Sequence, residues 1–145
     1  MDDMMFRMME LKSKGFYCSQ IMMLLAIDSQ GKENPDLIRA MAGLAFGVGI
    51  GEVCGALTGG ACILSLYAGK GTEDDEEHFR LMGMLTELGD WFHEIYGGQY
   101  GGISCNTITK EGTLRNERCG AVVVATYQKV LDLLVENDFD PSEGK

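Results

Sequence analysis

The sequence has few basic residues. Its 12 Lys and Arg stand against 22 Asp and Glu, which gives a formal net charge of −10. This charge repels the phosphates of nucleic acid and the anionic surfaces of membranes. The longest uncharged stretch, residues 53–69, is short for a membrane span and is rich in Gly, Ala, Ser and Thr. We therefore expect neither a nucleic-acid partner nor insertion into a membrane.

The sequence also lacks the features of a secretory signal, and it contains no Cys-x-x-Cys pair. Asp2 and Asp3 stand where a signal peptide carries bases, so we expect a cytoplasmic protein. At 145 residues, one domain can bury a hydrophobic core without the help of disulfides. In a reducing cytosol, an odd number of cysteines, here five, favours catalytic, redox or metal-binding roles over permanent bridges.

No segment shows the two-residue alternation of a strand, and helical spacing dominates instead. We predict an all-α fold, a single-domain bundle of about six helices in residues 1–137, followed by a flexible polar tail at residues 138–145. The helices are expected at residues 2–14, 19–31, 35–44, 53–68, 73–95 and 116–137. A glycine-rich loop at residues 47–51 precedes the central fourth helix, and residues 97–118 are predicted to cover a site.

Two capping signals set helix limits in this prediction. Asn34 followed by Pro35 is typical of an N-cap and a first helical residue. Thr72 followed by the acids of residues 73–77 predicts a second start, because acids in a first turn match the helix dipole. The fifth helix would then bury one face, formed by Phe79, Met82, Leu85, Leu88, Phe92 and Ile95.

Four of the five cysteines stand at expected helix starts: Cys18, Cys54, Cys105 and Cys119. The unpaired N–H groups and partial positive charge of a helix N-terminus favour the thiolate, which is both the nucleophile and the metal ligand. We therefore predict that these thiols lose their protons easily. The bases that lie near them in sequence, and that would add to this effect, are Lys12, Lys14, Lys110, Arg115 and Arg118.

Glycines surround Cys54 in the motif of residues 51–60. Glycine at positions 55 and 59 lets a cofactor, a partner helix or another sulfur approach the backbone beside Cys54. Gly55 and Gly59 are therefore candidate cofactor contacts. The alternative is a helix-packing surface of small residues with an incidental buried cysteine.

The order of these cysteines resembles the C_GCAxxG_C_C family of redox-active proteins over nearly the whole chain. The matching residues are Cys18 in Tyr17-Cys18-Ser19-Gln20, Cys54 in Cys54-Gly55-Ala56-Leu57-Thr58-Gly59, and then Cys105 and Cys119. The resemblance implies a redox-active thiol protein that uses these four cysteines. Cys62 falls outside the pattern, and we expect it to be a small core residue.

We consider first a thiol-dependent oxidoreductase, in which two of the four cysteines form a reversible disulfide and the others attack or resolve it. Cys54 with Cys119 is the preferred first pair. The partner would be a redox protein or a small thiol.

Two other hypotheses stay open. In one, Cys18, Cys54, Cys105 and Cys119 are ligands of zinc or of an iron–sulfur cluster, although their gaps of 36, 51 and 14 positions differ from the close pairs usual in such sites. In the other, the chain is a helical interaction protein with structural cysteines. Methionines crowd its first two helices and could form a homodimer face.

Overall fold

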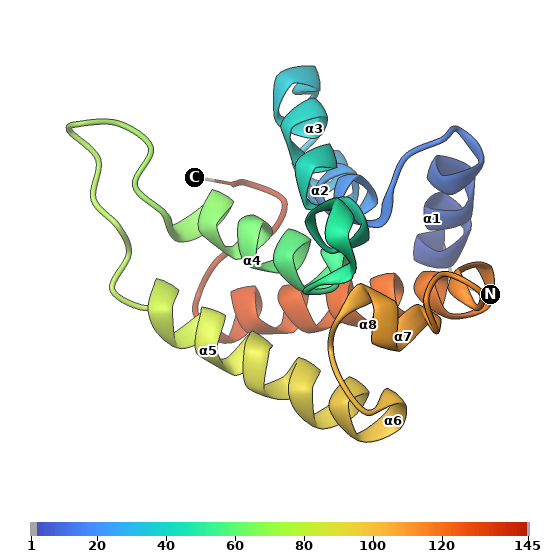
Figure 1. The fold of residues 1–145 in the computed structure, drawn as a ribbon. Helices are drawn as coiled ribbons and strands as arrows, with labels where there is room; N and C mark the ends of the chain where they lie inside the picture. Colours follow the sequence, from blue (N-terminus) through green and yellow to red (C-terminus); the bar gives the residue numbers. More distant parts are fainter. Residues whose placement is uncertain (1–2, 145) are drawn as a thin grey trace.

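The computed structural model describes residues 3–144, and within them every regular element is helical (Figure 1). Met1, Asp2 and Lys145 lie outside the described residues. Of these, Asp2 belongs to the predicted first helix and Lys145 to the predicted tail. The α-helices are α1 (Asp3–Ser13), α2 (Cys18–Ser29), α3 (Pro35–Met41), α4 (Gly55–Ala68), α5 (Leu81–Phe92), α6 (Gly98–Tyr100), α7 (Cys105–Thr109) and α8 (Arg115–Glu136). The all-α prediction is confirmed, and α6 and α7 are short helices within the expected covering segment, residues 97–118.

Helix α4 lies at the centre of the bundle and packs against α2, α5 and α8 (Figure 1). Its small residues make this packing close. A Cβ built on Gly60 would lie 3.2 Å from the side chains of both Leu88 in α5 and Val130 in α8. Leu88 and Val130 are almost completely buried. The small-residue packing surface expected on the fourth helix therefore lies in the middle of the core.

The start of α3 follows the predicted capping signal. The side chain of Asn34 accepts a hydrogen bond from the N–H of Leu37 at 3.1 Å, and Pro35 is the first helical residue. This bond satisfies one N–H group that the first helical turn leaves unpaired.

The predicted start of the fifth helix is wrong, because α5 begins at Leu81 and the acidic run lies in a loop that projects from the bundle (Figure 1). The Asp75 carboxylate accepts hydrogen bonds from the N–H groups of Gly71 (3.0 Å) and Glu76 (2.9 Å). It therefore supports a turn instead of a helix.

The buried face of α5 also differs from the predicted one. Leu88 and Phe92 are buried as expected, whereas Phe79, Met82 and Ile95 are exposed. The residues of α5 that are buried are Leu81, Met84, Leu88 and Phe92. Their spacing of three and four positions forms one continuous stripe along the shorter helix.

Residues 138–144, predicted as part of a flexible tail, lie against the bundle. The Tyr67 hydroxyl and the Ser29 hydroxyl both donate to the carbonyl of Pro141, at 2.5 and 3.2 Å. The Phe139 ring packs edge-on near Tyr67, and Arg80 pairs with Asp138 at 3.1 Å. Residues 138–141 therefore lie across the ends of α2 and α4.

The length and apolar character that a membrane crossing requires are not combined in any helix among residues 3–144.

Candidate functional site

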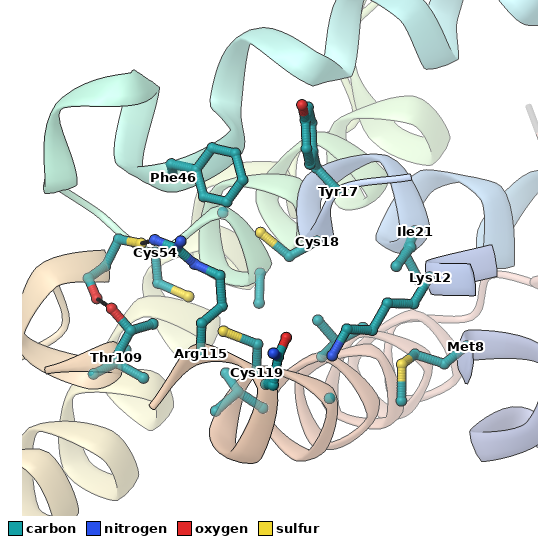
Figure 2. Close-up of a pocket in the computed structure, with 18 of the residues that line it drawn as sticks. Met8, Lys12, Tyr17, Cys18, Ile21, Phe46, Cys54, Thr109, Arg115 and Cys119 are labelled. Carbon is teal, nitrogen blue, oxygen red and sulfur yellow. Dashed lines mark hydrogen bonds between the residues drawn. The ribbon is translucent and has the colours of Figure 1, made fainter. Parts of the chain in front are cut away.

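Four helix starts meet around one cavity of about 130 Å³ (Figure 2). Cys18 is the first residue of α2, Cys54 immediately precedes α4, Cys105 is the first residue of α7, and Cys119 lies near the start of α8. All four cysteines line the cavity. The structure thus gathers in one place four residues that are spread over a hundred positions of sequence.

Cys54 and Cys105 are held together by an isolated antiparallel bridge between Val53 and Ser104. The N–H of each cysteine donates to a carbonyl of the opposite segment, at 3.0 Å for Cys54 and 2.5 Å for Cys105. Val53 is 38% exposed, whereas Cys54 and Cys105 are 8% and 7% exposed. Because side chains alternate along extended backbone, the bridge turns both thiols inward.

Gly55 makes room for the sulfur of Cys18. A Cβ at position 55 would lie 2.7 Å from Cys18 Sγ and 3.2 Å from the carbonyl oxygen of Leu44. The sulfur therefore lies against the first turn of α4, next to Cys54. Of the three occupants that the sequence suggests, a cofactor, a helix or a sulfur, the structure places a sulfur here.

Gly59 makes room for a helix. A Cβ there would lie 3.1 Å from the Cβ of Met22 and 3.3 Å from the Cα of Ser19, both in α2. The absence of a side chain at position 59 lets the backbone of α2 approach α4. Gly55 and Gly59 together fix how α2 and its first residue, Cys18, meet the start of α4.

The loop before Cys54 is the irregular turn that its glycines predict. Gly47, Gly49 and Gly51 have positive φ, and so do two residues with side chains, Phe46 (55°) and Val48 (59°). A Cβ on Gly51 would overlap the Asn106 side chain of α7, with a separation of only 2.0 Å. The loop thus packs tightly on α7 and directs the Phe46 ring to the cavity (Figure 2).

Arg115 brings a positive charge into the cavity. Figure 2 shows the Arg115 guanidinium between Phe46 and the cysteines. Its guanidinium carbon lies 4.4 Å from the centroid of the Phe46 ring, and its Nη2 lies 3.8 Å from Cys105 Sγ. Such an arrangement combines a cation–π contact with a contact to sulfur. Arg115 is nearest in sequence to Cys119, but in the structure its side chain contacts Cys105.

Only two of the five bases near the cysteines in sequence, Lys12 and Arg115, line the cavity. Lys14 instead pairs with Glu10 at 3.9 Å. Arg118 donates to the carbonyl of Ile108 at 2.9 Å, and Lys110 is exposed at the end of α7. Clustering of bases in sequence therefore overstates the charge that the thiols experience.

The prediction that these thiols lose their protons easily is wrong for three of them. Burial raises the pKa of Cys54 to about 12 and the pKa of Cys119 to about 11, and it also raises the pKa of Cys18. The neighbouring Cys18 raises the pKa of Cys54 and Cys119 further, whereas Arg115 and Lys12 lower that of Cys119 to a smaller extent. Removal from water outweighs the benefit of a helix start.

The fifth cysteine, Cys62, is partly buried and packs against the core, and it does not line the cavity. All five cysteines are free thiols. Among residues 3–144, no three or more His, Cys, Asp or Glu side chains are arranged as a metal site.

The family described as "Putative redox-active protein (C_GCAxxG_C_C)" matches residues 16–133 of the chain. This region begins just before Cys18 and contains the other three cysteines of the cavity. No curated protein and no solved structure matches the chain.

Proposed function

The chain belongs to the C_GCAxxG_C_C family of redox-active proteins, and on this premise we propose that it is a thiol–disulfide oxidoreductase of the cytoplasm. The observation that carries the proposal is that Cys18, Cys54, Cys105 and Cys119 all line one cavity. Buried cysteines that merely fill a core have no need to meet at an opening. The substrate is a disulfide of a small thiol or of a partner protein.

Cys54 is the central thiol in this proposal. Cys18 and Cys119 both raise its pKa, as expected of close neighbours, and Figure 2 shows Cys54 and Cys119 directed to the same space. We propose Cys54–Cys119 as the disulfide of the oxidised protein. In this proposal Cys18, whose sulfur lies beside Gly55, attacks that disulfide and exchanges with it.

The reaction is two successive exchanges. A protein thiolate attacks one sulfur of the substrate disulfide, a mixed disulfide forms, and the first substrate thiolate leaves. A second protein thiolate then attacks the protein sulfur of the mixed disulfide, which releases the second substrate thiolate. The two protons of the protein thiols end on the two substrate thiols, and two electrons pass from the protein to the substrate.

Arg115 has a defined part in this chemistry. Its guanidinium contacts Cys105 Sγ, and it also lowers the pKa of Cys18 and Cys119 against the larger effect of burial. Negative charge moves from sulfur to sulfur during exchange, and a fixed cation beside the sulfurs stabilises it. We assign Arg115 this role.

The test is to count thiols after oxidation with a limiting amount of diamide. We expect alkylation and mass spectrometry to find three thiols instead of five, with a Cys54–Cys119 linkage in the digest, and reduction to restore all five. Cys62→Ser, outside the cavity, should still lose two thiols, whereas Cys54→Ser should not form this disulfide.

Two outcomes would contradict the proposal. One is a protein that keeps all its thiols under oxidation that closes ordinary dithiols. The other is anaerobically purified protein with a stoichiometric metal and thiols protected from alkylation, which would favour ligation by the same cysteines.

A further inference from the structure

The cavity is positively charged although the protein is acidic. Lys12 and Arg115 line it, and within residues 3–144 no Asp, Glu or His does so. The net charge of the whole chain is −10. The N-terminal ends of three helices of 12, 14 and 22 residues, α2, α4 and α8, add unpaired N–H groups and the positive ends of their dipoles.

Neither cavity base is neutralised by the protein. In the part of the chain that the structure describes, Arg7, Lys14, Arg39 and Arg80 form ion pairs with carboxylates, and Lys12 and Arg115 do not. Arg115 is partly buried, and the hydrogen bond that its side chain makes goes to the sulfur of Cys105. Most of its five N–H donors therefore have no protein acceptor.

A guanidinium of this kind suits a carboxylate. Its planar fork can donate two parallel hydrogen bonds to the two oxygens of one carboxyl group. The cation–π contact with Phe46 limits the motion of the guanidinium, so that less freedom is lost when the anion binds. The exposed Asn116, next in sequence, also lines the cavity and offers an amide.

The size and remaining lining of the cavity limit the rest of the ligand. Its volume of about 130 Å³ is well above the roughly 10–15 Å³ that one water needs. Apart from the bases and cysteines, apolar side chains such as Met8, Ile21 and Val122 make up much of the wall. A small molecule with a short apolar body fits this space.

We propose that the cavity takes a low-molecular-weight disulfide whose thiol carries a carboxylate, with the carboxylate on Arg115 and the disulfide against the cysteines. This inference rests on the proposed function and specifies its substrate class. The balanced reaction is that the protein dithiol and the disulfide RS–SR give the protein disulfide and two RSH, through one mixed disulfide.

The test compares three small disulfides that differ in charge: 3,3′-dithiodipropionate (anionic), 2-hydroxyethyl disulfide (neutral) and cystamine (cationic). The rate of protein thiol loss is measured for each. We expect the anionic disulfide to react fastest, roughly tenfold faster than the neutral one. One hydrogen bond to a charged group changes an affinity or a rate by about this factor. Long-range repulsion by a net charge of −10 acts in the opposite direction, so this preference must arise within the cavity.

Matched variants locate the preference. Arg115→Met should abolish it, Arg115→Lys should keep part of it because the charge remains, and Lys12→Gln should weaken it. Lys14→Gln is the control, since Lys14 lies outside the cavity and pairs with Glu10. Circular dichroism of each variant separates loss of preference from loss of fold.

A second measurement separates this inference from the proposed function. Binding of 3-(methylthio)propionate, which cannot exchange, is followed by NMR beside its neutral amide. Arg115-dependent binding of the acid alone supports the carboxylate site even if no disulfide reacts. Equal rates for the anionic and neutral disulfides, or binding that Arg115→Met leaves unchanged, would overturn the inference while leaving thiol exchange intact.

Discussion

The sulfur of Cys18 lies where a side chain at Gly55 would have to be: a Cβ on Gly55 would approach Cys18 Sγ to 2.7 Å. The glycine beside Cys54 thus serves the first cysteine of the chain as much as the second. The close packing of α2 against α4 therefore also sets where the thiols of Cys18 and Cys54 lie.

Gly55→Ala should therefore change the chemistry more than the fold. The added methyl group displaces Cys18 Sγ, which can rotate, and presses on the Leu44 carbonyl, which cannot. We expect a destabilisation of about 1–3 kcal/mol, typical of overpacking, and slower exchange between Cys18 and the proposed Cys54–Cys119 disulfide. Urea denaturation and mapping of disulfides over time measure the two effects. Unchanged exchange in a destabilised protein would separate Cys18 from the reaction.

Gly60→Ala tests the centre of the bundle and leaves the cavity alone. Its methyl group would meet Leu88 and Val130 at 3.2 Å, so we expect a loss of about 1–3 kcal/mol in the free energy of unfolding. Gly83→Ala in α5 is the matched control, because nothing lies within 4 Å of its Cβ. Alanine there should stabilise the protein by about 0.5–1 kcal/mol. Equal effects at positions 60 and 83 would contradict this account of the core.

Stability should fall in alkali because of the buried thiols. The pKa of Cys54 is raised by burial from its ordinary value of 9.0 to about 12, and that of Cys119 to about 11. Below pH 9 both states hold the proton and the stabilisation is complete. Above pH 9 the unfolded chain ionises first, so stability declines until the folded thiols ionise as well.

The measurement is the free energy of unfolding of reduced protein between pH 7 and 10.5, compared with Cys54→Ala. Other buried groups titrate in alkali too, including Tyr127, whose pKa is also raised by burial to about 12. The difference between wild type and variant isolates Cys54. We expect this difference to shrink as the pH rises above 9. A constant difference would show that folding does not raise the pKa of Cys54.

Val48→Gly should stabilise the loop before Cys54. Val48 has φ of 59° and is 57% exposed, so it is held in a left-handed conformation without burying its side chain. Such strain costs about 1–3 kcal/mol, which exceeds the entropy that glycine adds to the unfolded chain. We expect a gain of about 1 kcal/mol by urea denaturation. Val48→Ala keeps most of the strain, so it should give little or no gain in stability.

Local signals in the sequence predict some parts of this structure well. Asn34 and Pro35 start α3 because an N-cap bond spans three residues and needs no tertiary contact. The glycines of residues 47–51 predict their turn for the same reason. Thr72 and the acids after it fail as a helix start, since Asp75 makes turn bonds to Gly71 and Glu76 instead.

The sequence predicts which cysteines form the site, but it does not predict the pKa of their thiols or the charges beside them. Position at a helix start can be read from sequence, and it places Cys18, Cys54 and Cys105 correctly. Depth of burial depends on how distant helices pack, and it raises the pKa of Cys54 against the effect of the helix start. The contact of Arg115 with Cys105 likewise depends on the Phe46 loop, 69 positions earlier in the chain.

The bridge between Val53 and Ser104 also has a consequence for biosynthesis. It joins two segments that leave the ribosome far apart in time, and Cys119 follows later still on the last long helix. While only the first hundred residues have been made, Cys18 and Cys54 lack the walls that later cover them. We therefore expect these two thiols to be more accessible to small thiol reagents in the nascent chain than in the folded protein.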